Sequence, residues 1–309
     1  MVTATKPVVE LFGVEVSDTT QPWQTIVGDQ TCPFLGKRCY KTRKSDSSIS
    51  IGTCTVSDGN PPEPIMICPT RLTDRGKIFN DCMHLLTLHE PGNDLHLIPE
   101  VPIPGGQVDY FLVSAKDDKV VDFVGIELQT LDTTGTVWPE RQRTLLKLGL
   151  TPEDSEAAAR TTPYGMNWKH TAKTILVQMH HKAMTFEHVN RKLVLVIQNE
   201  LLSYMESKFR FSHFHSPATI SDTVHLHAYG LKPPGTGRRA LTLGSRISTD
   251  TDGIGEALGV QAETRLELEA ITELLEQRMS DLTLYSSTNA AAAVQQSANV
   301  AAPGAEALD

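Results

Sequence analysis

Two acids and one glutamine are spaced along the 309-residue chain in a way that could bind a divalent cation. Asp109 follows a Gly-Gly pair at the start of one apolar segment, and Glu127 and Gln129 lie two residues apart in the next. In a strand, this spacing puts Glu127 and Gln129 on one face. Carboxylates among apolar residues need a cationic partner, and Mg²⁺ prefers such oxygen ligands. We therefore expect Asp109 and Glu127 to hold magnesium against a phosphate; the alternative is that each pairs with a distant lysine or arginine.

The elements that would position these residues follow from the hydrophobic pattern. Short apolar, β-branched segments predict strands, and apolar residues at helical spacing predict helices. The expected order is a helix at 77–89, strands at 96–103, 107–114 and 119–131, a helix at 167–189, a strand at 192–198 and a helix at 201–209. This order predicts an α/β fold with a mixed central sheet, in which a short turn brings Asp109 close to Glu127.

Four of the five cysteines could form a metal site. Cys32, Cys39, Cys54 and Cys68 fall in a segment rich in proline and glycine, and four thiolates from separate loops suit a tetrahedral metal. Their spacing lacks paired C-x-x-C knuckles, so the alternative is four buried thiols in a reducing compartment. Cys82 lies in the predicted helix that follows, away from the group, and is expected to be a plain buried thiol.

The formal charge of -9 does not exclude a nucleic-acid partner, because it is confined to one end of the chain. Residues 250–309 contain eleven acids and two bases, and the first 249 residues contain 26 of each. Two segments are basic: residues 32–77 have eight bases against four acids, and residues 207–247 have six against one. Such segments suit phosphate contacts, although ordinary solvated charge is the alternative for any single residue. The candidate DNA-binding residues are Lys37, Arg38, Arg43, Arg210, Arg238 and Arg239.

The chain divides into four expected parts. Residues 1–76 form the cysteine-rich segment, 77–249 the α/β core with the basic loops, 250–285 a C-terminal amphipathic helix, and 286–309 a low-complexity tail expected to be disordered. The helix either packs on its own domain or pairs with a second copy. No apolar run is long enough to cross a membrane, and the N-terminus has no secretory signal, so the expected location is the cytoplasm.

Two histidine pairs, FSHFH at 211–215 and HLH at 225–227, are each expected to share one face of a strand. An H-x-H pair can bind a metal, but no acid is clustered with either pair. Structural or DNA-contacting roles are therefore favoured for these histidines.

The acidic motif resembles that of the PD-(D/E)XK nuclease superfamily. The superfamily pattern, an Asp after a turn and then Glu/Asp-x-Lys on the paired strand, reads here as GGQVD and GIELQ. With four cysteines upstream and DTTG after the motif, the chain resembles more specifically the NotI-type restriction endonuclease family. The resemblance implies a restriction-endonuclease-like core in a homodimeric, magnesium-dependent type II enzyme that cuts double-stranded DNA at a long, GC-rich palindrome. It also implies structural iron at the four cysteines, where spacing alone suits zinc equally well.

One residue departs from the superfamily pattern, because Gln129 stands where a lysine is usual. Glutamine keeps a hydrogen bond that can orient the attacking water, but it lacks the positive charge. Lys169 or Lys173 of the predicted helix could restore that charge, and either could instead be a solvated helix lysine. Glu100, before the Gly-Gly turn, could supply a further carboxylate, with Glu90 as the competing choice.

The expected function is magnesium-dependent hydrolysis of phosphodiester bonds in double-stranded DNA by a cytoplasmic bacterial restriction enzyme, paired in function with a DNA methyltransferase. Two rivals are a nuclease of the same fold acting in repair or recombination, and a catalytically inactive, metal-stapled DNA-binding protein. The intact acids disfavour the inactive protein, because degenerate sites commonly lose a carboxylate. The two basic segments disfavour a structural metal protein with no DNA role.

Overall fold

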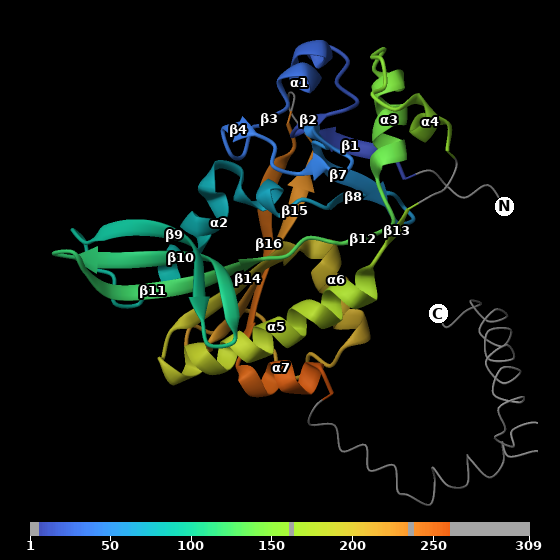
Figure 1. The fold of residues 1–309 in the computed structure, drawn as a ribbon. Helices are drawn as coiled ribbons and strands as arrows, with labels where there is room; N and C mark the ends of the chain where they lie inside the picture. Colours follow the sequence, from blue (N-terminus) through green and yellow to red (C-terminus); the bar gives the residue numbers. More distant parts are fainter. Residues whose placement is uncertain (1–5, 161–163, 234–237, 260–309) are drawn as a thin grey trace, which may run out of the picture. The chain divides into compact units, whose positions relative to one another are not determined.

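The computed structural model describes residues 6–160, 164–233 and 238–259 (Figure 1). They all belong to the first of the two units into which the chain divides, Met1–Gln261. Most of the amphipathic helix predicted at 250–285, and all of the tail predicted at 286–309, lie outside the described residues. The last described element is helix α7 (Thr251–Ala257), which begins where the Asp250 carboxylate accepts a hydrogen bond from Gly253 N.

A mixed six-stranded sheet forms the centre of this unit, in the order β16-β15-β14-β11-β10-β9. β14 pairs in parallel with β11 and with β15, and the other neighbouring strands are antiparallel. The strands are β9 (Asp94–Ile103), β10 (Gly106–Lys116), β11 (Lys119–Leu128), β14 (Lys192–Gln198), β15 (Val224–Lys232) and β16 (Ala240–Thr249). The predicted α/β class with a mixed sheet is confirmed.

The central strand β14 shows why both faces of the sheet are covered. Its sequence is apolar at every position from Leu193 to Ile197, the pattern of a parallel strand buried on both sides. Leu193, Leu195 and Ile197 belong to one core, and Val194 and Val196 belong to the core on the opposite face. Helical segments therefore pack on each face.

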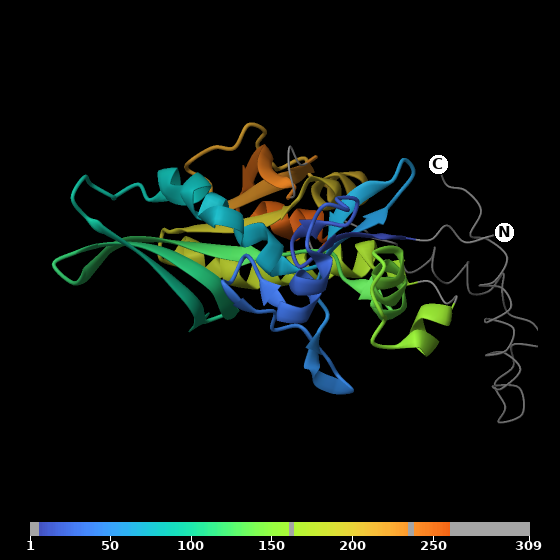
Figure 2. The ribbon, with the colours of Figure 1, turned by 90° about the horizontal axis from the view of Figure 1, so that it is seen from above.

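Three helices cover the first face and shorter helical segments cover the second. The helices on the first face are α5 (Trp168–His188), α6 (Asn199–Lys208) and α7. Those on the second face are the 3-10 segment η1 (Pro69–Gly76), the helix α2 (Lys77–Cys82) and the 3-10 segment η2 (Met83–Leu85). Figures 1 and 2 show α5 and α7 side by side, with α2 across the sheet from them. The helix predicted at 77–89 is thus shorter and ends in a 3-10 turn.

The cysteine-rich segment builds a second, antiparallel sheet in the order β2-β1-β7-β8. Its strands are β1 (Val8–Leu11), β2 (Val14–Glu15), β7 (Thr53–Asp58) and β8 (Glu63–Met66). The rest of the segment consists of helix α1 (Trp23–Asp29) and the strand pairs β3 (Thr31–Cys32) with β4 (Lys37–Arg38) and β5 (Thr42–Arg43) with β6 (Asp46–Ser50). Val56 and Ile65 pack in the core beneath α5, so this sheet and the central sheet share buried residues.

Short elements connect β11 to α5 along the chain. They are β12 (Thr133–Thr134), α3 (Trp138–Lys147), α4 (Ser155–Ala159) and β13 (Gly165–Met166). Leu145 of α3 packs with Leu11 and Trp23 of the cysteine-rich segment. Among the residues that the structure describes, no helix is long and apolar enough to cross a membrane.

Candidate active site

Asp109 of β10 and Glu127 of β11 lie next to each other at the end of the ladder that joins these strands. The strands pair Tyr110 with Ile126, so the next position along the ladder brings Asp109 opposite Glu127. The Asp109 carboxylate accepts a hydrogen bond from Leu128 N at 2.8 Å. The two carboxyl groups therefore belong to one site.

Glu100 of β9 adds a third carboxylate beside this pair. The register of the β9–β10 ladder places Glu100 opposite Asp109. Glu100 is exposed and has a φ of 56°, in the left-handed region that is unfavourable for a residue with a Cβ atom. Glu90, the competing choice, is exposed in the loop before β9. Of the two candidates, Glu100 is the one that the fold brings to Asp109.

A buried lysine of α5 that is absent from the sequence-based candidates contacts Glu127. Lys182 Nζ lies 2.6 Å from Glu127 Oε1 and donates a 2.6 Å hydrogen bond to Gln107 O. The first contact is a close ion pair between the two side chains. Lys182 follows Ile175 by seven residues and precedes Phe186 by four, on the buried stripe of α5. A lysine on an otherwise apolar helix stripe needs a buried anionic partner. The position of Lys182 on this stripe is therefore the feature of the sequence that could have indicated it.

The lysines expected to supply the missing charge lie elsewhere. Lys169 and Lys173 are exposed on α5. Gln129 follows the end of β11, where its backbone N–H donates to Val196 O at 3.0 Å and its side-chain amide donates to Thr130 O. The structure therefore does not bring Lys173 to the carboxylates, and it directs the Gln129 amide to the backbone of the next residue.

Burial disfavours the charged form of both carboxyl groups. It raises the pKa of Asp109, and the hydrogen bond from Leu128 N and the Lys182 ammonium oppose this rise. Burial also raises the pKa of Glu127 to about 7; Lys182 opposes the rise and the Asp109 carboxylate adds to it. A divalent cation between the two groups would favour their ionised forms. The raised pKa values fit a hard cation bound by oxygen ligands. The Lys182 ammonium already pairs with Glu127, which is the alternative that the sequence offered for this acid.

A cavity of about 350 Å³ lies beside Asp109. One wall comes from the central sheet and includes Glu100, Asp109 and Tyr110. The other wall comes from the cysteine-rich segment, and every lining residue there is within three positions of a cysteine. These residues are Leu35, Lys37, Tyr40, Pro69 and Thr70. The two candidate sites of the chain therefore adjoin.

The four candidate cysteine ligands border one small space. Cys32, Cys39, Cys54 and Cys68 are buried free thiols that line a cavity of about 10 Å³. Burial raises the pKa of Cys54 well above its ordinary value, and charge at Cys68 raises it further. Within the described ranges, however, no three or more histidine, cysteine or acidic side chains are arranged as ligands of a metal ion. The structure groups the thiols without giving them coordination geometry.

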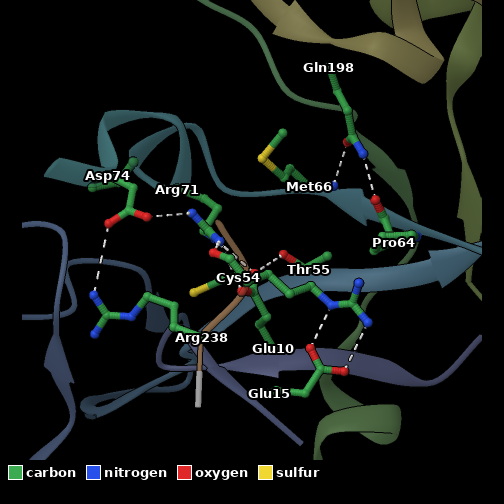
Figure 3. Close-up of polar contacts among 12 residues, drawn as sticks. Glu10, Glu15, Cys54, Thr55, Pro64, Met66, Arg71, Asp74, Gln198 and Arg238 are labelled. Carbon is green, nitrogen blue, oxygen red and sulfur yellow. Dashed lines mark hydrogen bonds and ion pairs between the residues drawn. The ribbon is translucent and has the colours of Figure 1, made fainter. Parts of the chain in front are cut away.

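A buried ion pair lies close to Cys54 (Figure 3). Arg71 Nε lies 2.8 Å from Glu10 Oε2 and Arg71 Nη2 lies 3.0 Å from Glu10 Oε1, and both side chains are fully buried. Thr55 Oγ1 donates a further hydrogen bond to Glu10. The Glu10 carboxylate also contributes to the raised pKa of Cys54. This network joins η1 to β1 and β7 next to the thiols.

Cys82 and the HLH motif lie together on the second face of the sheet. Cys82 is fully buried, with Sγ 3.7 Å from His227 Nδ1. Burial lowers the pKa of His225 to about 4 and that of His227 to about 3. The FSHFH segment does not form a strand, because His213 lies in a turn and His215 in an isolated β-bridge. The expected strand geometry therefore holds for HLH alone.

Three of the six candidate DNA-binding residues are engaged by acids of the same chain. Arg43 Nη2 lies 2.7 Å from Asp154 Oδ2. Arg239 binds both carboxylate oxygens of Glu15, through Nε at 2.5 Å and Nη2 at 3.1 Å. Arg238 Nη1 lies 3.9 Å from Asp74 Oδ1 (Figure 3), and its guanidinium lies 5.5 Å from the centroid of the Phe34 ring. These three arginines are paired within the chain.

The other three differ in exposure and contacts. Exposed Arg38 donates to the backbone carbonyl groups of Ser47 and Ser48 in β6. Lys37 and Arg210 are exposed, and within the described residues no acid pairs with the Lys37 ammonium. Lys37 is therefore the basic candidate that combines a free charge with a place in the cavity beside Asp109.

Comparison with known proteins identifies no family for this chain. No protein-family model matches it, and no curated protein matches its sequence.

Proposed function

We propose that this protein is a magnesium-dependent type II restriction endonuclease that hydrolyses double-stranded DNA at a specific, GC-rich palindromic site. The observation that carries the proposal is the pair Asp109 and Glu127 on adjacent strands, with a buried lysine bound to Glu127 and a cavity beside Asp109. The helix α5 and the parallel strand β14 that follow the motif support a restriction-endonuclease-like core.

Asp109 and Glu127 would hold the magnesium ion, and Glu100 is placed to contribute a third carboxylate. Bound magnesium supplies charge neutralisation at the phosphate and a more acidic water. Gln129 would orient the attacking water once its amide leaves Thr130 O. Hydrolysis then adds the hydroxyl of that water to phosphorus, breaks one P–O bond and delivers a proton to the leaving oxygen.

The cysteine-rich segment would contribute to DNA binding. Lys37 lines the cavity with no acidic partner in the described part of the chain, so its ammonium is available to a phosphate. Structural iron or zinc at the four cysteines would hold the loops that carry Lys37 and Tyr40. A two-fold symmetric homodimer would match the symmetry of a palindromic target. A cytoplasmic methyltransferase would protect the host DNA.

The test is incubation of the full-length protein with plasmid or phage DNA and magnesium, followed by gel electrophoresis. Discrete bands are expected, and they should disappear when the magnesium is chelated. Asp109→Asn and Glu127→Gln should each lower the rate at least about 100-fold. Glu90→Gln, which changes an exposed acid outside the site, should cut at the wild-type rate.

Other outcomes would point to the rival functions. A smear of fragments would indicate a nuclease of the same fold without site specificity. Binding without cleavage would indicate an inactive DNA-binding protein. Wild-type cleavage by both carboxylate variants would contradict the proposed site.

A further inference from the structure

Lys182 is a buried charge that the fold accommodates at some cost. Its side chain is 7% exposed on the apolar face of α5. Burying an ammonium group is unfavourable unless it is paired and hydrogen-bonded, and here Glu127 and Gln107 O are the two partners. Replacing such a pair by apolar residues is often neutral or stabilising. Stability alone therefore does not explain why a lysine is present.

The Gly-Gly turn before β10 is fitted to this lysine. A Cβ atom at Gly105 would lie 2.7 Å from His181 O, and one at Gly106 would lie 3.2 Å from Lys182 Cε. Both glycines also have positive φ values, of 95° and 133°. Only a chain without side chains at these positions can approach α5 so closely. The turn that introduces Asp109 is thus also the turn that lets Lys182 reach the carboxylates.

The site otherwise has an excess of negative charge. Glu100, Asp109 and Glu127 lie on three neighbouring strands, and Gln129 brings no positive charge to them. The exposed lysines of α5 do not compensate, since Lys173 points its charge to solvent. Among the described residues, Lys182 is the lysine that pairs with one of these acids, Glu127, while Lys37 only lines the cavity beside Asp109.

We infer that Lys182 is the positioning residue that takes over the electrostatic role of the lysine expected where Gln129 stands. The inference rests on the proposed function and adds a residue to it. Lys182 acts through Glu127: it holds that carboxylate at the end of β11 and offsets one negative charge of the acidic cluster. The charge thus reaches the site from α5 instead of from the strand motif.

A lysine relocation in the full-length protein tests this inference. Lys182→Met removes the charge, and Gln129→Lys added to that variant returns it at the motif position. Lys173→Met is the matched control, an exposed lysine of the same helix. Lys182→Met should lower magnesium-dependent cleavage at least about 100-fold, and Lys173→Met should change it less than about twofold. Gln129→Lys should raise the rate of the Lys182→Met protein at least about tenfold.

Binding of Mn²⁺ without DNA gives a second readout, measured from the electron paramagnetic resonance signal of free Mn²⁺. Removal of a positive charge beside a cation site should tighten Mn²⁺ binding about tenfold. A lysine with a merely structural role would leave Mn²⁺ binding unchanged or weaken it when removed. Circular dichroism checks the fold, and Lys182→Gln, whose amide can donate to a carbonyl, replaces Lys182→Met if that variant does not fold.

The outcomes separate this inference from the proposed function. Cleavage at the wild-type rate by the folded Lys182 variant, or unchanged Mn²⁺ binding, would overturn the role of Lys182 and leave the nuclease proposal intact. Failure of the wild-type protein to cut any DNA would contradict the nuclease proposal, and the Mn²⁺ measurement would then decide the role of Lys182 alone.

Discussion

Glu100 lies opposite Asp109 in the β9–β10 ladder while its own backbone is left-handed, with a φ of 56°. A left-handed residue with a Cβ atom is strained, and strain of this kind costs of order 1 kcal/mol or more. The strained residue of β9 is thus the one that faces the central carboxylate of the candidate site. Such strain tends to persist where it serves function.

Replacement of Glu100 by glycine should therefore stabilise the protein and weaken its activity. Glu100→Gly relieves the backbone and should raise the free energy of unfolding by about 0.5 to 1 kcal/mol. It also removes a carboxylate beside Asp109, so magnesium-dependent cleavage should fall about tenfold. Asp117→Gly is the control, because Asp117 has a similar φ of 51° in the β10–β11 turn. Equal effects of both variants on cleavage would argue against a role for Glu100.

Loss of one partner from the buried Arg71–Glu10 pair should be strongly destabilising. Arg71→Met leaves the Glu10 carboxylate buried without its bidentate partner, so the free energy of unfolding should fall by about 3 to 5 kcal/mol. Lys44→Met, at an exposed lysine, should change it by less than about 0.5 kcal/mol. Chemical denaturation measures both. A small effect at Arg71 would mean that water reaches Glu10.

Gly105 should tolerate a methyl group far less well than Gly92. Both have φ near 95°, at 95° and 96°, so backbone strain is matched. A Cβ atom at Gly105 would meet His181 O, whereas nothing lies within 4 Å at Gly92. Gly105→Ala should therefore cost about 2 kcal/mol more than Gly92→Ala in thermal or chemical unfolding. Equal costs would show that the turn does not need its close approach to α5.

Acid should destabilise the protein through His225 and His227. Both pKa values are lowered by burial, to about 4 and about 3, from an ordinary value of 6.5. The unfolded chain therefore binds protons first, and stability present above pH 6.5 is lost as the pH falls toward 4. The loss should be roughly 3 kcal/mol for each histidine by pH 4.5.

Unfolding free energies at pH 7 and pH 4.5 measure this loss. The double variant His225→Asn, His227→Asn should lose much of the difference between the two pH values. His96→Asn, at an exposed histidine of β9, should keep it. An unchanged pH dependence in the double variant would show that carboxyl groups alone cause the acid sensitivity.

A metal at the four cysteines should depend on Cys54 and not on Cys82. Cys54 borders the space that all four thiols share. Cys82 lies against His227 in the core on the second face of the central sheet. Cys54→Ser should remove the metal and lower the melting temperature by roughly 5 to 10 °C, whereas Cys82→Ser should keep the metal. Elemental analysis of the purified proteins identifies the metal as iron or zinc. Equal metal content in both variants, or none in the wild type, would contradict a cysteine site.

Local patterns were sufficient for much of the fold. The apolar run Leu193–Ile197 predicts a strand buried on both faces, and the spacing of Ile175, Met179 and Phe186 predicts the buried stripe of α5; both are found. Two other elements differ from their predictions. The end of the helix predicted at 77–89 could not be placed, because its apolar residues suit both a regular helix and the 3-10 turn at Met83–Leu85.

The alternation of H-x-H predicts a strand at residues 211–215, but these residues do not form one. A strand also needs a neighbouring strand to pair with, and alternation alone does not provide it.

The amino-acid sequence by itself determined that Asp109 and Glu127 sit on consecutive strands joined by a short turn, because alternation and turn residues are local properties. Only the tertiary structure decided that Lys182, and not Lys173, meets Glu127. That choice depends on which side of α5 packs on the sheet and on how closely the Gly105 turn approaches the helix. Contacts between distant segments arise from packing, which no local pattern encodes.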